Sequence, residues 1–170
     1  MQARKEHFSV RHDEGKSVWL GPGLGVVFKL SGEDTGGSFS LVEHPIKPGT
    51  IVPPHTHTRE DETSFVIEGE MGARIGDKIL TATPGTYVFK PRNVPHTFWN
   101  AGTKTTRIIE IISPPGFDKY FEEMAELVPA GGPPDFDKVD KLARQYGLSF
   151  HMDWLPELTA KYKLKLLGND

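Results

Sequence analysis

The chain has 170 residues, which is enough for one domain with a substantial core. Its formal charge of −3 and the lack of a basic block argue against nucleic acid as a partner. The sequence contains no cysteine, which excludes disulfides, thiolate metal ligands and a cysteine nucleophile. No apolar run approaches the length of a membrane span, and the first residues lack a secretory signal. We therefore expect a cytoplasmic protein without a membrane partner.

Short strand candidates, separated by Gly and Pro, occupy most of the chain up to residue 112. They cover residues 17–20, 26–30, 38–43, 51–57, 62–68, 72–75, 78–82, 86–90, 97–100 and 106–112. Gly76-Asp77 suits the two-residue turn of a hairpin. Many short strands with regularly spaced turn residues indicate an all-β sandwich or barrel.

After Pro115 and Gly116 the period of the apolar residues changes from two to about 3.6. One helical stripe follows from Phe117 to Leu127, and a second helix is predicted from Asp135, as N-cap, to near Gly147. The segment 129–134 is a linker or a lid. We assign residues 1–116 to a barrel with an N-terminal arm, and 117–170 to a helical extension of the same domain. The extension serves as a lid, a buttress or a dimer contact.

Two segments concentrate residues that can bind a metal ion. In the first, His55 and His57 alternate in a strand, so both side chains face the same side and can reach one ion. A carboxylate follows, for which Asp61 and Glu62 compete. In the second segment, His96 follows a Pro-containing turn. The other histidines lack such neighbours and are expected to be structural or exposed: His7, His12, His44 and His151.

These segments resemble the two sequence motifs of the cupin superfamily. The first motif corresponds to Gly49, His55, His57, Glu62 and Gly69, and the second to Gly85, Pro91, Asn93, His96 and Asn100. Nine of these ten positions match the family pattern. The exception is Asn93, where the family usually has Gly, and Asn is the next most tolerant residue of the left-handed region. The resemblance implies a cupin (jelly-roll-like) β-barrel with C-terminal α-helices.

The resemblance also favours Glu62 over Asp61, so the implied metal ligands are His55, His57, Glu62 and His96. Three imidazoles and one carboxylate leave two positions of an octahedral ion open. We therefore expect one divalent transition metal ion, with Mn, Fe, Ni or Co favoured. Zn is possible but would indicate a closed site. The family further implies a homodimer, because exposed edge strands need covering.

The surrounding features are similar to those of small single-domain cupins of the quercetin-dioxygenase-like kind. This resemblance implies an oxygen-using, dioxygenase-like enzyme acting on a small aromatic or enolisable molecule. Glu62 would then be a catalytic base as well as a ligand. Two alternatives stay open, namely a metal-dependent isomerase or decarboxylase, and a non-catalytic small-molecule-binding cupin.

The substrate pocket is predicted from strand parity and hydrophobicity. Phe98 shares the parity of His96 and is expected to face inward, and Phe89 and Val66 are further pocket candidates. Asn100 has the same parity as Phe98 and is expected to brace the inner face. Four more residues are inward candidates: Phe65, Tyr87, Ile109 and Ile111. Such walls would suit an aromatic or otherwise apolar substrate that offers an oxygen to the metal.

Overall fold

The computed structural model describes residues 8–128 and 134–169, so His7 and residues 129–133 lie outside the description. The strands up to residue 113 are β1 (Ser17–Leu20), β2 (Leu24–Leu30), β3 (Ser40–Ile46), β4 (Thr50–Ile51), β5 (His55–His57), β6 (Asp61–Glu68), β7 (Met71–Ile75), β8 (Lys78–Ala82), β9 (Tyr87–Lys90), β10 (His96–Asn100) and β11 (Thr106–Ser113). They are followed by α1 (Asp118–Leu127), α2 (Phe136–Gln145), β12 (Leu148–Phe150), a 3₁₀ turn (Met152–Trp154), α3 (Leu155–Tyr162) and β13 (Lys165–Leu166). Within the described ranges, no helix combines the length and apolar character that a membrane crossing requires.

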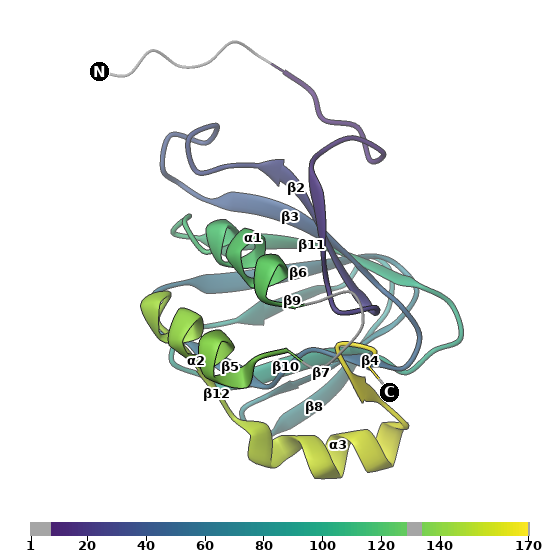
Figure 1. Ribbon diagram of the computed structural model, residues 1–170. Helices are drawn as coiled ribbons and strands as arrows, with labels where there is room; N and C mark the ends of the chain where they lie inside the picture. The colour runs from purple at the N-terminus through teal and green to yellow at the C-terminus, as the bar shows by residue number, and fades with distance from the viewer. Residues whose placement is uncertain (1–7, 129–133, 170) are drawn as a thin grey trace.

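The strands form two facing sheets, as the sequence predicted (Figure 1). Sheet A has the order β1-β2-β3-β11-β6-β9. Sheet B has the order β12-β5-β10-β4-β13, and β7 joins β10 and β8. Helices α1 and α2 lie on the same side of the molecule and pack on each other, α1 against sheet A and α2 beside β12. The two helices therefore cover one opening between the sheets.

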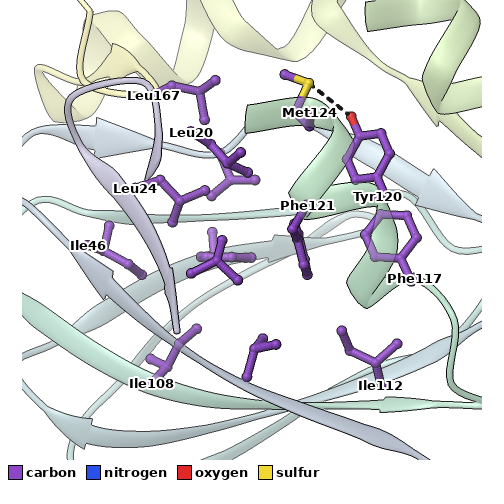
Figure 2. Close-up of a cluster of buried hydrophobic side chains, with 14 of the residues drawn as sticks. Leu20, Leu24, Ile46, Ile108, Ile112, Phe117, Tyr120, Phe121, Met124 and Leu167 are labelled. Carbon is purple, nitrogen blue, oxygen red and sulfur yellow. Dashed lines mark hydrogen bonds between the residues drawn. The ribbon is translucent and has the colours of Figure 1, made fainter. Parts of the chain in front are cut away.

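The apolar core fills the space between the sheets and α1. Strand residues such as Val66, Ile108 and Ile112 have no exposed surface. Figure 2 shows the side chains of α1 and its N-terminal Phe117 facing Leu20, Leu24 and Leu167 across this core; the α1 residues are Tyr120, Phe121 and Met124. Burying an aliphatic or aromatic side chain of this size contributes about 1.5–3 kcal/mol. The predicted helical stripe is thus part of the barrel core.

The C-terminal extension contributes strands as well as helices. β12 pairs with β5 in antiparallel fashion, and β13 pairs with β4 in parallel. Helix α3 packs Leu158 into a second apolar cluster with Ile51 and Trp99. Strands β12 and β13 were not predicted, because runs of two or three residues are too short to show a strand period. Helix α3 was not predicted either. The extension therefore completes sheet B.

Two local predictions are confirmed at individual residues, and a third is corrected. The Asp135 side chain accepts a hydrogen bond from the Lys138 backbone N–H as the N-cap of α2. Asn93 has a φ of 63°, in the left-handed region, and its N–H donates to the His57 carbonyl at 2.7 Å. The predicted strand 51–57 is two strands, β4 and β5, because Pro53 and Pro54 lie between them and lack the N–H that a sheet ladder needs.

Candidate metal centre

Four side chains from three strands converge inside the barrel. His55 and His57 come from β5, Glu62 from β6 and His96 from β10, and their ligand atoms lie within 4.8 Å of one another. Strand pairing explains the convergence, since His96 lies directly opposite His55. None of the four is more than 7% exposed. Asp61, the competing carboxylate, instead pairs with Arg92 at 2.8 Å, away from the cluster.

The Nδ1 atom of each histidine faces an acceptor outside the cluster. That of His55 lies 2.6 Å from the Pro53 carbonyl oxygen, and that of His96 lies 3.1 Å from the Val94 carbonyl oxygen. A carbonyl oxygen can only accept, so Nδ1 carries the proton and Nε2 keeps its lone pair. The His57 Nδ1 lies 3.4 Å from a Glu60 carboxylate oxygen. Such partners orient metal-binding histidines and fix their tautomer.

The inner atoms of the cluster fit a divalent metal ion. The Nε2 of His57 lies 3.3 Å from Glu62 Oε1, and the Nε2 of His96 lies 3.2 Å from Glu62 Oε2. Neither ring nitrogen of His57 makes a well-formed hydrogen bond with the described residues. A buried polar atom without a partner is costly, and a metal ion between these atoms would satisfy it. Three imidazoles and one carboxylate are a transition-metal donor set.

The protonation of the metal-free cluster follows from its burial and its carboxylates. Burial opposes the charge of His57, but Glu62 and Glu60 outweigh it and raise the pKa of His57 to about 9. Burial lowers the pKa of His55 and of His96, and neighbouring imidazoles lower that of His55 further. At neutral pH, His57 therefore holds a second ring proton. Metal binding would release it, because a ligating imidazole is neutral.

A buried ion-pair network that was not predicted from the sequence extends from Glu62. Lys90 on β9 places Nζ 3.1 Å from Glu62 Oε2 and 2.7 Å from Glu110 Oε2. The Ser64 hydroxyl donates to the same Glu110 oxygen at 2.8 Å. Lys90 also lies 4.6 Å from the centre of the Phe98 ring. Pairing sets this geometry, because Glu62 is opposite Lys90, and Ser64 is opposite Glu110.

The ammonium group of Lys90 is shared by two carboxylates that respond differently. Burial disfavours its charge, but Glu110 and Glu62 outweigh burial and raise the pKa of Lys90. Burial also disfavours the charge of Glu62, but Lys90 and His57 outweigh it and hold its pKa well below the usual value. For Glu110, burial prevails over Lys90 and raises the pKa to about 7. Glu62 is therefore ionised, whereas Glu110 can exchange a proton near neutral pH.

A cavity of about 50 Å³ lies beside the cluster. His55 and Glu62 form part of its wall, and Glu110 and His44 also line it. The rest of the lining is largely apolar and comes from strands, α1 and the C-terminal extension: Leu20, Leu24, Val52, Pro53, Phe98, Phe117, Tyr120, Phe121, Met124, Leu148, Phe150 and Leu167. The position of the cavity would bring a bound molecule against two candidate metal ligands.

Of the predicted pocket residues, one lines the cavity, one lies in the barrel core and one is exposed. Phe98 lines the cavity, whereas Val66 is buried in the barrel core and is not part of the cavity wall. The prediction for Phe89 is wrong, because its side chain is 58% exposed on the outer face of sheet A. The reason is that β9 turns Lys90 inward to meet Glu62 and Glu110, which overrides hydrophobicity. The same parity places the following residues outward: Phe65, Tyr87, Ile109 and Ile111.

Asn100 and His44 are both buried in the barrel but act differently. The Asn100 amide donates to the carbonyls of Ile46 and Lys104, each at 2.8 Å, and so braces β10 against β3 and the following turn. His44 places Nδ1 3.0 Å from the Gly25 carbonyl oxygen, and burial lowers its pKa to about 4. His44 is thus a neutral, structural histidine in the cavity wall.

The two facing sheets and the buried three-histidine, one-glutamate cluster define a β-barrel protein with a candidate metal centre. Residues 43–112 match the family model of the cupin domain. These residues, which contain all four candidate ligands, therefore form a cupin domain. Among curated protein sequences, none matches this chain significantly.

Solved structures share the fold at low sequence identity. KdgF from Halomonas sp. is 19% identical, with a TM-score of 0.59 over 66% of this chain and 99% of that chain. A predicted oxalate decarboxylase from Thermotoga maritima is 20% identical, with a TM-score of 0.57 over 62% and 97%. The polyketide cyclase RemF from Streptomyces resistomycificus is 27% identical, with a TM-score of 0.55 over 63% and 79%. The barrel is thus shared by proteins with different names and chemistries.

Proposed function

We propose that the protein is a metal-dependent, dioxygenase-like enzyme that acts on an aromatic or enolisable molecule at the His55, His57, Glu62 and His96 centre. The observation that carries this proposal is the position of the cavity, which has His55 and Glu62 in its wall and otherwise mostly apolar residues. Such a cavity favours an apolar molecule whose oxygen is directed at the centre. The similarity to a polyketide cyclase, at 27% identity, is in keeping with an enolisable substrate.

A divalent transition metal held by the four residues would supply Lewis acidity toward a substrate oxygen and the means to activate dioxygen. Glu62 is the base of the proposed reaction. Its carboxylate is ionised, lines the cavity and can accept a proton from a hydroxyl or an acidic C–H group of the substrate. Lys90, 3.1 Å away, stabilises that carboxylate. Phe98 and Phe117 line the same space and give it an apolar wall.

A second function, proton transfer without dioxygen, is favoured by one specific observation. Glu110 also lines the cavity, and its Oε1 has no hydrogen-bond partner within the described part of the chain. Glu62 and Glu110 have pKa values displaced in opposite directions. Two carboxyl groups of this kind in one site can act as a base and an acid. The alternative is therefore an isomerase or decarboxylase.

The test is to follow oxygen uptake and product mass together. Protein loaded separately with Fe, Mn, Ni or Co is incubated with flavonols, 1,3-diketones and phenols. We expect the amount of dioxygen consumed to match the amount of a product that contains both of its oxygen atoms. Product formation without oxygen uptake would support the isomerase or decarboxylase instead. Retention of a ligand without turnover by any metal form would indicate a binding protein.

Two substitutions provide a matched pair for this test. Glu62→Gln keeps the size of the side chain but removes the base and the charged ligand, so activity should fall to background. Asp61→Asn makes the same chemical change on the neighbouring residue, whose carboxylate pairs with Arg92 outside the cluster. Its activity should be close to that of the wild type. Equal losses in the two variants would contradict the role given to Glu62.

A further inference from the structure

A second, larger hollow lies on the outside of the barrel, beside the covered cavity. This groove has a volume of about 1070 Å³. It is lined by Phe136 and Val139 from α2, by Met152, and by residues of β12 and the C-terminal segment. Phe136 is 56% exposed, so the groove presents apolar surface to solvent.

The groove and the cavity share a wall. Five residues line both spaces, and we call them the shared wall: Pro53, Met124, Leu148, Phe150 and Leu167. The two spaces are therefore separated by one layer of side chains. The wall reaches the metal centre, since the Pro53 carbonyl holds Nδ1 of His55. It also contains an unbranched methionine, Met124, a residue type that repacks readily around a ligand.

The size of the cavity limits what it can hold alone. At about 50 Å³ it can hold a few water-sized groups, whereas pockets that enclose drug-sized ligands measure about 300–1,000 Å³. A molecule with more than a few heavy atoms must therefore extend beyond the cavity. The groove lies directly behind the shared wall and has the volume to receive the remainder.

The chemistry of the groove restricts the part of the molecule that it would hold. Its charged lining residues, Asp140 and Arg144, form an ion pair with each other at 2.6 Å. Ser149 and Asn169 are polar, and the remaining lining residues are apolar. The groove therefore suits an uncharged hydrocarbon group better than a charged one.

We propose that the cavity and the groove form one binding site for an elongated molecule with an oxygen-bearing head and an uncharged hydrocarbon tail. The head lies in the cavity against His55 and Glu62, and the tail passes the shared wall into the groove. Met124 and Phe150 move aside to admit it, and Phe136 covers it. This inference rests on the proposed function, because the head needs a metal ion at the centre.

The experiment uses a series of alkyl hydroxamates, whose head chelates metals and whose tail length can be varied. Binding to the cobalt-loaded protein is followed through the visible spectrum of the metal. We expect octanohydroxamate to bind at least about thirtyfold more tightly than acetohydroxamate, because each buried methylene strengthens binding about three- to fourfold and burial of about three of its six additional methylenes already gives this factor. Hexanohydroxamate should lie between them.

Two exposed apolar residues give matched variants. Phe136→Asp places a charge in the groove and should weaken octanohydroxamate about tenfold, with acetohydroxamate unchanged. Ile79→Asp makes a similar change on β8, outside the lining of both spaces, and should alter neither affinity.

The outcomes separate this inference from the proposed function. If acetohydroxamate binds but the affinity does not grow with tail length, the two-part site is wrong and the metal centre stands. The groove is also excluded if Phe136→Asp and Ile79→Asp behave alike. If the cobalt spectrum responds to no hydroxamate, or cobalt does not bind, the proposed function itself fails and the inference fails with it.

Discussion

Beside the candidate metal centre, the two faces of strands β6, β9 and β11 locally reverse the usual arrangement of a β-barrel. Their inner face carries the charged groups of Glu62, Lys90 and Glu110, all of which are buried. The outer face of β9 carries two aromatic rings, Tyr87 at 69% exposure and Phe89 at 58%. Neighbouring residues on one strand, Phe89 and Lys90, thus have the opposite orientation to that expected from their hydrophobicity.

This contrast indicates that the buried charges of the inner face cost stability and are present for the candidate metal centre. Removing an ion from water costs several kcal/mol even after relaxation, and well-packed apolar residues would often be as stable. The inner charges are therefore better explained by the metal centre and the cavity that they adjoin. The outer rings, by contrast, form an exposed apolar patch, which is a feature of interaction surfaces.

The largest expected effect comes from removing the central charge of the inner face. Lys90→Met leaves Glu62 and Glu110 without their shared cation and should lower the free energy of unfolding by about 3–5 kcal/mol. Urea denaturation of the metal-free protein measures it. Adding Glu110→Gln should recover part of the loss. Lys78→Met, the same change at an exposed strand position, should cost no more than about 0.5 kcal/mol, and an equal cost for both would contradict the network.

Burial of His44 inside the barrel should make the free energy of unfolding depend on pH. Burial lowers its pKa from 6.5 to about 4, so the unfolded chain binds a proton more readily than the folded protein between these values. The burial of neutral His44 therefore contributes fully to stability above about pH 6.5, and this contribution is lost as the pH falls toward about 4. The loss amounts to about 2 kcal/mol by about pH 5. His44→Phe should remove that part of the slope in denaturation experiments. His12→Phe, at a 76% exposed side chain, should keep the wild-type slope.

Substitution of Glu60 tests whether its carboxylate orients the candidate metal ligand His57. Its carboxylate lies 3.4 Å from Nδ1 of His57, so Glu60→Gln should weaken metal binding by about 10- to 100-fold. The same substitution lowers the pKa of His57, which eases release of its proton. The loss should therefore be larger at about pH 9 than at about pH 7. Competition with a chelating indicator measures both, and a loss as large for Asp61→Asn would argue against a specific role.

Substitutions on the outer face of β9 should change the free energy of unfolding little and the oligomeric state strongly. We propose that a second copy of the chain covers Tyr87 and Phe89 in a homodimer. Phe89→Glu should then give a monomer by light scattering. The free energy of unfolding of the isolated chain should change by no more than about 0.5 kcal/mol. A wild-type protein that is already monomeric would remove the basis for this prediction.

The metal ligands and the barrel could be predicted from the sequence because their signals are local. His55, His57 and His96 are recognised by residue type and spacing, and α1 by its apolar period, whereas the choice of Glu62 over Asp61 came from the resemblance to the cupin motif. The Lys90–Glu110 network has no local signal, because it depends on how β6, β9 and β11 pair. A clue was available in β11, where Glu110 shares the parity of Ile108 and Ile112.

The error at Phe89 has the same origin. Hydrophobicity favoured turning Phe89 inward, but the strand can turn only one of Phe89 and Lys90 toward Glu62. The charge pairing that decides between them is visible only after the strands are placed. Similarly, β12 and β13 are defined by their partners β5 and β4, and their own sequences are too short to indicate strands.

The most direct test of the account is the metal content of untagged protein purified without chelators or a nickel column, then reconstituted with divalent Fe, Mn, Ni or Co. We expect about one ion per chain for the wild type and little or none for His57→Ala, which removes one of the four candidate ligands. Failure of every metal to bind the wild type, or equal binding by His57→Ala, would contradict it.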